Sequence, residues 1–208
     1  MNRLPDTRHS LLLRLANGGD GDAWAKFLDV YERVIFRFVC SRGLQPADAE
    51  DVTQRVLEAV FEKARQWEPG ASRGSFGAWL FRVARNLSAK VWNERIHRDV
   101  ACRGSGDEVR RLQTPELSEE DKTIFHLEYR RALFRWAADR VRVHVERCTW
   151  EAFWRTAVDG LDPDRVANDL GLSLSSVYAA KCRILARIRT EIDCFENDFS
   201  ILREQKSS

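Results

Sequence analysis

Apolar residues recur at intervals of three and four along most of the chain, the spacing that places them on one face of an α-helix. The first such pattern follows Asp22, a good helix N-cap, and ends at Gly43. A second begins at Pro46, a residue suited to the first helical turn, and a third follows a loop at residues 68–75. The three expected apolar stripes are Ala23, Phe27, Val30, Tyr31, Val34, Ile35 and Phe38; Val52, Val56, Ala59, Val60, Ala64 and Trp67; and Phe76, Trp79, Leu80, Val83, Leu87 and Val91.

The periodic pattern fails between about His97 and Glu120, where glycine, serine and mixed charges replace the apolar repeat. Such a composition is typical of a flexible linker. No alternating pattern of apolar and polar residues bounded by hairpin turns occurs in the chain, so we expect no sheet. The sequence predicts an all-α fold of two helical domains, with domain one at residues 1–98, a flexible linker at 99–119 and domain two at 120–208.

The second domain ends in a pattern typical of a helix-turn-helix. It begins with a long helical pattern from Glu120 to Arg147 and a shorter one from Trp150 to Val158. A further short helix starts at Pro163, Gly171 supplies a sharp turn, and Ser173 is a good N-cap for the last helix. That helix has no acid before Glu191, and its cationic residues are Lys181, Arg183, Arg187 and Arg189. The charge pattern suits an approach to phosphates, although a plain amphipathic hairpin with a solvated basic face is the alternative for this segment alone.

Composition sets the class of protein. The 208 residues are 44% hydrophobic, enough for one good core or two small ones. The apolar stretch Leu11–Leu13 is too short for a secretory signal, and no run approaches membrane-spanning length, so we expect a cytoplasmic protein without membrane insertion. The five cysteines are scattered without metal-ligand spacing, so we expect reduced thiols and no metal or other cofactor. The net charge of +2 decides nothing about nucleic acid, because the basic residues are concentrated locally.

The sequence lacks the common catalytic motifs. It contains no glycine-rich phosphate loop, no GxSxG and no HExxH, so we expect the protein not to be an enzyme. Asp48, Glu50 and Asp51 would point in different directions on a helix. They suit the positive end of the helix dipole far better than a metal ion.

The polar face of the third expected helix has a composition suited to unpaired DNA. It shows Arg82, Arg85, Asn86, Lys90, Asn93 and Arg95, with Trp79 and Trp92 among them. Aromatic rings can stack on exposed bases, and amides can bond to base edges. Trp79 also falls on the expected apolar stripe, so a place in the core is the competing interpretation for that residue.

Three segments follow one another along the chain: Asp48–Gln54 (DAEDVTQ), Phe76–Asn86 (FGAWLFRVARN) and the helix-turn-helix. In combination they resemble the extracytoplasmic-function (ECF) group of sigma-70-type RNA polymerase sigma factors, and the resemblance covers most of the chain. It implies that the first domain is region two, which binds the clamp helices of the largest subunit of the polymerase core and opens the −10 element. It implies that the second domain is region four, which binds the β flap and reads the −35 element.

The resemblance also implies roles for residues of the first domain. Asp51 and Gln54 fall on the polymerase-binding motif of the family, with Asp48 beside them. Arg55 departs from the family pattern, in which an acid is usual, so one polar contact with the core would have to be rearranged. The loop at 68–75 matches the segment that helps to hold an extruded base. For the −10 element the expected residues are Trp79, Arg82, Arg85, Asn86, Lys90 and Asn93.

In the second domain, the residues expected at the −35 element are Ser175, Ser176, Tyr178, Ala179, Lys181, Cys182, Arg183 and Arg187. The resemblance implies that four of these face the groove: Tyr178, Ala179, Cys182 and Arg183. Arg183 is the strong donor to guanine among them. We therefore expect part of the specificity to come from DNA shape and from phosphate contacts of Lys181 and Arg187.

The expected function is that of a subunit that directs core RNA polymerase to promoter DNA and begins transcription. A free-standing helix-turn-helix regulator is the alternative, and a helical interaction module with no DNA role is a third hypothesis. Asp51, Gln54 and the aromatic, basic third helix favour the first hypothesis, and the acid-free helix after Ser173 argues against the third. An anti-sigma factor is a further candidate partner; the sequence leaves open whether one exists, and whether it is membrane-bound or soluble.

Overall fold

The computed structural model of the chain describes residues 21–64, 76–103 and 118–197. All regular structure in these ranges is α-helical and no strand occurs in them, which confirms the all-α prediction. The chain divides into two compact units, and the boundary lies between Ala132 and Leu133. This boundary falls inside α5 (Glu119–Arg142) and not in the expected linker.

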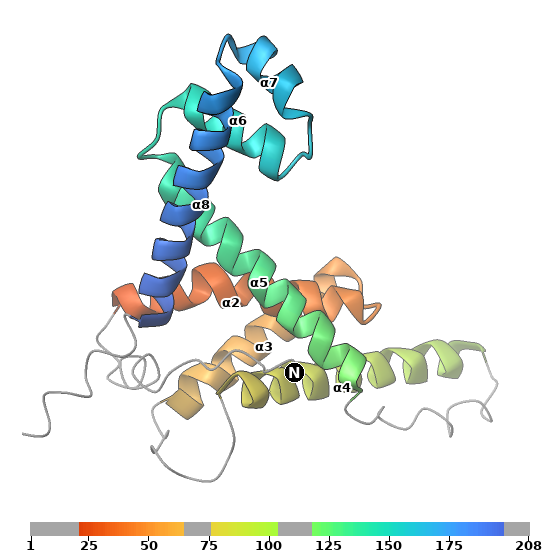
Figure 1. Cartoon of the computed structure of the whole chain (residues 1–208). Coiled ribbons are helices and arrows are strands. Elements are labelled where there is room, and N and C mark those ends of the chain that lie inside the picture. The colour runs from red at the N-terminus through yellow and green to blue at the C-terminus, as the bar shows by residue number, and fades with distance from the viewer. Residues whose placement is uncertain (1–20, 65–75, 104–117, 198–208) are drawn as a thin grey trace, which may run out of the picture. The chain divides into compact units, whose positions relative to one another are not determined.

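The first unit is built from the first part of α5, residues 119–132, and three further helices: α2 (Gly21–Ser41), α3 (Pro46–Ala64) and α4 (Phe76–Arg103). Helix α3 packs against both α2 and α4 (Figure 1). The chain turns after α2 at Gly43, whose φ of +87° lies in the left-handed region that favours glycine. Helix α3 then starts at Pro46, as the sequence predicts.

Aromatic side chains from three helices meet in the core of the first unit. The Phe38 ring of α2 lies edge-to-face with Phe81 of α4 at a centroid distance of 5.5 Å, and with Phe125 of α5 at 5.4 Å. Phe125 is fully buried, and Tyr129, one turn later, lies 5.6 Å from Tyr31. Residues 119–132 of α5 therefore complete the core of the first unit.

A charged pair anchors the start of α5 in the same unit. The Ser118 hydroxyl accepts a hydrogen bond from the Asp121 backbone N–H at 3.0 Å, which caps the helix. The Asp121 carboxylate, whose side chain is only 4% exposed, accepts a hydrogen bond from the guanidinium of Arg42, just beyond the end of α2. A buried carboxylate without a partner costs free energy, so Asp121 must stay beside Arg42. This requirement holds the first turn of α5 against the end of α2.

Helix α4 differs from its sequence prediction at both its face and its end. It continues to Arg103, so residues 99–103 of the expected linker are helical, and the remainder, 104–117, lies outside the described residues. Of the expected apolar stripe, Trp79, Val83 and Leu87 are only half-buried. Among the side chains of α4 that the structure describes, in residues 77–94, the buried ones are Leu80, Phe81, Ala84, Ser88 and Val91.

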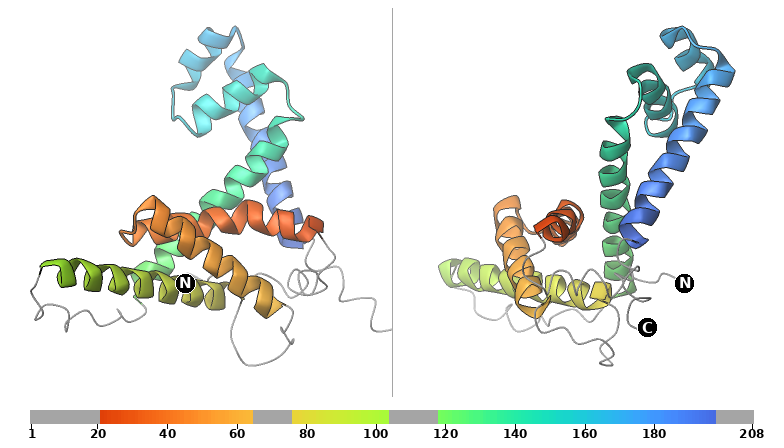
Figure 2. Two further views of the ribbon diagram at one scale, coloured as in Figure 1. Left: turned by 180° about the vertical axis from the view of Figure 1, so that it is seen from behind. Right: turned by 90° about the vertical axis from the view of Figure 1, so that its left-hand side faces the viewer.

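The second unit contains the rest of α5 and three further helices: α6 (Arg147–Ala157), α7 (Pro163–Leu170) and α8 (Leu174–Asn197). Helix α6 packs against both α7 and α8, and α7 packs against α8 (Figure 2). The chain leaves α5 at Arg142, five residues before the end that the sequence pattern predicts. The larger of its two core clusters comprises Ala137, Ala138, Val141, Trp150, Phe153, Ile184 and Ile188.

Helices α7 and α8 occupy the segment predicted as a helix-turn-helix. The Asp162 side chain caps α7 by accepting from the backbone N–H groups of the next turn. Gly171 has φ +64°, and the Leu172 N–H then reaches the Ala167 carbonyl at 2.9 Å, a Schellman-type ending. The Ser173 hydroxyl caps α8 by accepting from the Ser176 N–H at 3.1 Å, as the sequence predicts.

Candidate nucleic-acid interface

The outer side of α4 gathers most of the residues expected at the −10 element. An α-helix turns by about 100° per residue, so positions three, four, seven and eleven apart share one side. This rule places Trp79, Arg82, Asn86, Lys90 and Asn93 in one strip, opposite the buried face of the helix. Trp79 therefore stands on the polar side of α4 and is half-buried, which disfavours its interpretation as a core residue.

Two contacts organise this outer side. A terminal nitrogen of Arg85 donates a hydrogen bond to the Asn86 side-chain oxygen at 3.2 Å. Lys90 lies 3.9 Å from Glu94 one turn later, a weak surface pair because both side chains are at least half exposed. The polar strip of α4 thus keeps a net positive charge.

Trp92 is a further aromatic residue of α4 beside this strip. Its ring lies against Gly43, with the nearest ring atoms 3.6 Å from where a Cβ would be, and it remains 37% exposed. The sequence pattern names Trp92 with Trp79 as a ring that could stack on exposed bases, but a single aromatic at helical spacing does not reveal which neighbour it packs on. The loop at 68–75, expected to hold an extruded base, lies outside the described residues.

The outer face of α8 carries the four residues expected to face the groove, with Ser175, also expected at the −35 element, beside them. Ser175, Tyr178, Ala179, Cys182 and Arg183 are all exposed, on the side opposite the buried side chains of the helix. Tyr178 is 51% exposed, and three of the other four side chains are small. A face of small side chains lets a helix backbone come close to a flat or grooved surface.

Three further residues expected at the −35 element lie at the edges of that face: Ser176, Lys181 and Arg187. Arg187 donates a hydrogen bond from its guanidinium to the His144 carbonyl at 3.2 Å, so it lies toward the turn between α5 and α6. Lys181 is half-buried at the opposite edge. The hydroxyls of Ser175 and Ser176 lie 2.9 and 2.7 Å from the Ser173 hydroxyl, so they reinforce the cap of α8.

A third exposed face lies on α3 and contains the residues expected to bind polymerase. Asp51, Gln54 and Arg55 are exposed and Asp48 is half-buried, all on the side opposite the apolar core positions of the helix. Within the described residues, Asp51, Gln54 and Arg55 make no ion pair or hydrogen bond through their side chains. Glu58 and the 47% exposed ring of Phe61 extend the same face, although neither residue is among those predicted from the sequence. Glu58 could have been predicted from the sequence, because residues seven apart, such as Asp51 and Glu58, lie on the same side of a helix.

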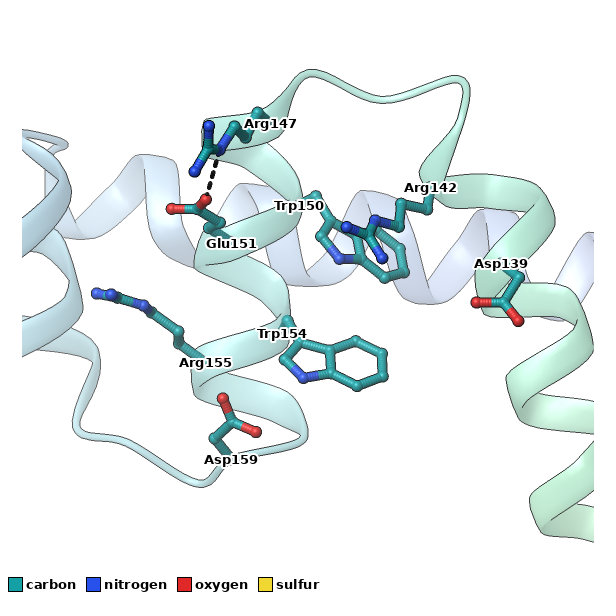
Figure 3. A pocket seen from close by; sticks show the side chains of 8 residues that line it. All are labelled: Asp139, Arg142, Arg147, Trp150, Glu151, Trp154, Arg155 and Asp159. Atoms are coloured by element: carbon teal, nitrogen blue, oxygen red, sulfur yellow. Dashed lines mark hydrogen bonds and ion pairs between the residues drawn. The ribbon is translucent and has the colours of Figure 1, made fainter.

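A cavity of about 580 Å³ lies in the second unit between the end of α5 and α6 (Figure 3). Trp150 and Trp154 stack at 5.5 Å along one side of it. A hydrogen bond of 2.8 Å from Arg147 lowers the pKa of the Glu151 carboxyl at its rim. Its charged lining side chains balance, three arginines against three acids: Arg142, Arg147, Arg155, Asp139, Glu151 and Asp159. Because these charges balance, the lining gives no net attraction for a phosphate. We therefore do not count this cavity as part of the basic surfaces expected to bind DNA.

Metal and membrane sites do not emerge from the described parts of the chain. No group of three or more His, Cys, Asp or Glu side chains within them could hold a metal ion. None of the helices found there combines the length and the apolar character needed to cross a membrane. The cysteines whose side chains are described, Cys40, Cys148, Cys182 and Cys194, are free thiols.

Comparison with known proteins shows which family the chain resembles. Residues 27–95, which span most of α2, all of α3 and the outer face of α4, match the family described as sigma-70 region 2. The RNA polymerase sigma-E factor of Streptomyces antibioticus is 28% identical over 165 residues, which cover 77% of this chain and 79% of the relative. The corresponding protein of Streptomyces avermitilis is 27% identical over 165 residues, 77% of this chain and 80% of the relative.

A third relative aligns over a shorter stretch. The ECF RNA polymerase sigma factor BldN of Streptomyces coelicolor is 34% identical over 79 residues, 38% of this chain and only 29% of the relative. The chain thus spans less than a third of that relative but about four fifths of the sigma-E factors. The match to sigma-70 region 2 includes the exposed faces of α3 and α4, and the sigma-E relatives align over 77% of the chain. Together these matches identify the chain as a sigma factor of the sigma-70 family, in the extracytoplasmic-function group.

Proposed function

We propose that this chain directs core RNA polymerase to its promoters through three separate helical faces: α3 binds the polymerase, α4 engages the −10 element and α8 reads the −35 element. The observation that supports this proposal is that each face is exposed, lies opposite a buried core face, and has a distinct chemistry. The partners would be the clamp helices of the largest polymerase subunit, the β flap and promoter DNA. The protein would act in the cytoplasm without catalysing a reaction itself.

The α3 face suits a protein partner. Asp51, Gln54 and Glu58 present acceptors, and Phe61 adds an exposed ring at the same side of the helix. An exposed aromatic ring beside polar groups is typical of a protein–protein interface. Arg55 stands where the family usually has an acid, and Glu58, one turn on, is the acid that could supply that contact.

The α4 face suits single-stranded DNA. Trp79 offers a ring for stacking, Asn86 an amide for a base edge, and Arg82 a cation for the backbone. All three lie within two turns on one side of the helix. A duplex major groove would not need a stacking ring, because its bases are already stacked on one another.

The α8 face suits duplex DNA. Its small side chains allow a close approach to the major groove, and Arg183 can donate two hydrogen bonds to guanine. Lys181 and Arg187 lie at the two edges, where the phosphates of a groove would run. A free-standing helix-turn-helix regulator would use this face as well, but it would have no use for the faces of α3 and α4.

The experiment that tests the polymerase contact is co-elution with core RNA polymerase. Replacing Asp51 and Gln54 together by Ala should leave the helices intact, because exposed changes cost little stability, and should weaken co-elution. Replacing Asp29 and Glu32, which are exposed on α2, removes comparable polar groups elsewhere and should have no effect. Wild-type affinity of the Asp51 and Gln54 double variant would reject α3 as the polymerase-binding helix.

The two DNA faces are separated by permanganate footprinting on a promoter selected by the holoenzyme from genomic DNA. Asn86→Ala should reduce thymine reactivity near the start site, and pre-melted promoter DNA should restore part of the signal. Arg183→Ala should weaken promoter binding by about 1–3 kcal/mol and relax base preference at one upstream position. Equal loss of upstream protection and of strand opening in both variants would contradict this division of roles.

A further inference from the structure

We propose that the segment at residues 1–20, which precedes α2, covers the exposed face of α3 in the free protein and must leave that face before the polymerase binds. The inference rests on the proposed role of α3 and adds a regulation to it. The segment lies outside the described residues, whereas the side chains of the face that it would cover are described from Pro46 to Glu62.

Helix α3 is strongly acidic. Between Pro46 and Glu62 its sequence has five acids and one basic residue, Arg55. Three of these acids, Asp51, Glu58 and Glu62, are exposed on one side of the helix, because they stand seven and four residues apart. Within the described ranges the carboxylates of these three make no ion pair. This side of α3 therefore attracts a cationic partner.

An aromatic patch lies where the face of α3 meets α2. The Phe61 ring is about half exposed, and it packs on the Trp24 ring at a centroid distance of 5.3 Å. The Trp24 indole N–H is shielded from solvent and finds no acceptor among the described residues. A shielded donor without an acceptor costs free energy. The patch therefore offers apolar surface and one unsatisfied donor to a segment that lies over it.

The composition of residues 1–20 is complementary to this surface. An apolar cluster, Leu11–Leu13 and Leu15, stands beside Arg8 and Arg14, and no acid occurs between residues 7 and 19. The leucines suit the exposed ring of Phe61, and the arginines suit the acids of α3. Charge and apolar character thus point to the same occupant.

The segment is joined to α2 close to this patch. Helix α2 begins at Gly21, and Trp24 lies in its first turn. Along α3, at 1.5 Å per residue, Glu58 and Asp51 lie about 5 and 15 Å from Phe61. Arg14 stands seven residues before Gly21, and seven extended residues span about 23 Å. The arginines and leucines of the segment can therefore reach the whole face.

The covalent tether allows a weak contact to cover the face. A segment joined to its site by a short flexible linker has an effective concentration in the millimolar range. An affinity of about 1 mM is then enough to cover the face half of the time or more. The cover lowers the apparent affinity for polymerase by the fraction of molecules in which the face is free, and tighter binding of polymerase displaces it.

Photo-crosslinking of the free, full chain tests whether the segment covers α3. A photoreactive benzoylphenylalanine in place of Leu12 should crosslink to α3 or to the first turn of α2, as mapped by mass spectrometry. Arg8→Glu with Arg14→Glu should abolish this crosslink. Adding Glu58→Arg and Glu62→Arg to the same chain should restore it, because the charges are then exchanged. A crosslink to other helices, or none, overturns the proposal.

A charge-matched control is available on α2. Arg33 and Arg37 are both exposed there, so Arg33→Glu with Arg37→Glu changes the net charge by the same amount without touching the segment. This variant should keep the wild-type crosslink. Its loss would show that overall charge, and not the contact of residues 1–20 with α3, controls the crosslink, which overturns the proposal.

Affinity for core RNA polymerase tests the displacement. The chain with Arg8→Glu and Arg14→Glu should bind core roughly three- to ten-fold more tightly than the wild-type chain, because a face that was covered most of the time is now free. Leu11→Ser with Leu12→Ser removes apolar contacts without changing the charge and should act in the same direction. Unchanged or weaker binding of both variants overturns the displacement.

The inference and the proposed role of α3 fail in different ways. If the chain with Asp51→Ala and Gln54→Ala binds core as the wild-type chain does, α3 is not the polymerase-binding helix, and the displacement is overturned with it. The crosslink is measured without polymerase, so it decides by itself whether residues 1–20 cover α3. A crosslink to α3 together with unchanged affinity of the Arg8 and Arg14 variant would show that polymerase uses a face that the segment leaves free.

Discussion

Helices α4 and α8 both present a basic, exposed face, but the two faces are made of different side chains. The face of α4 has a large ring, amides and long cations in one strip, whereas that of α8 has small side chains around Tyr178 and Arg183. A ring and an amide serve bases that are already unstacked, and small side chains serve close approach to an intact groove. The two faces thus have the same sign of charge. The size and shape of their side chains indicate which form of DNA, unpaired or duplex, each face is expected to bind.

The two faces also differ in what holds them in place. Helix α4 belongs to a core that depends on contacts distant in sequence, such as the pair of Arg42 and Asp121, which are 79 residues apart. Helix α8 also packs on distant segments through Ile184 and Ile188, but its start is set locally by the turn at Gly171 and the cap at Ser173. The start of the second face should therefore be sensitive to changes in its own turn, and the first face to changes far from it.

The largest expected effect comes from removing the buried pair. Arg42→Ala leaves the Asp121 carboxylate buried without its partner and should cost about 3 kcal/mol in the free energy of unfolding of the first unit. Hydrogen exchange should then accelerate in α2 and α4 and stay unchanged in α8. Arg37→Ala, an exposed change on the same helix, is the control and should alter neither unit. Equal acceleration in both units would mean that they share one source of stability.

A smaller effect is expected from the ring of Trp79. Trp79→Ala removes a stacking surface and should weaken binding of the unpaired −10 strand to holoenzyme by about 2 kcal/mol, with no change for −35 duplex. Fluorescence anisotropy with the two DNA forms measures both effects. Trp79→Phe keeps a ring and should recover most of the affinity. Loss of duplex binding in Trp79→Ala would show that the two faces do not divide the DNA as we propose.

The turn between α7 and α8 should contribute somewhat less. Gly171→Ala places a Cβ on a residue with φ +64°, which should cost about 1–2 kcal/mol although no neighbouring atom lies within 4 Å. The loss should appear in the unfolding of the second unit and in −35 binding, while single-strand binding persists. Gly21→Ala, at an open position without positive φ, is the control and should not reduce stability. An unchanged second unit would show that the turn tolerates a side chain.

The smallest effect concerns His126, in the part of α5 that belongs to the first unit. Burial, and then the charge of Arg130, lower the pKa of His126 below its ordinary value. The native state therefore binds a proton less readily than the unfolded chain, so stability is full above the ordinary pKa and falls as the pH drops through it. The effect should be small, because His126 is only partly buried and solvent screens its charge. His126→Gln should flatten this part of the pH profile of the first unit; an unchanged profile would assign the acid sensitivity to other groups.

Local signals allowed much of the fold to be predicted from the sequence. The ends of α2 and α7 follow from Gly43 and Gly171, and the starts of α3 and α8 from Pro46 and Ser173. These residues act on the backbone within one turn, so their effect does not depend on the rest of the chain. The exposed faces of α3 and α8 follow in the same way from the helical period.

The parts that could not be predicted depend on packing between distant segments. The apolar stripe expected for α4 counted Trp79 and Val83, but the buried face turns toward Ala84 and Ser88. Small side chains leave room for a neighbouring helix to approach closely, and a count of apolar residues gives them little weight. The pairing of Arg42 with Asp121 is equally invisible, because nothing in either local sequence specifies the other.

The small side chains on the outer face of α8 have a consequence for how this protein can change. Ala179 and Cys182 take no part in the core, so, if α8 reads the −35 element as proposed, a mutation at either can add a new base contact without disturbing the fold. A single nucleotide change in the gene could then redirect the protein toward another set of promoters. The same positions are the natural places to randomise in a laboratory search for sigma factors that serve synthetic promoters and ignore native ones.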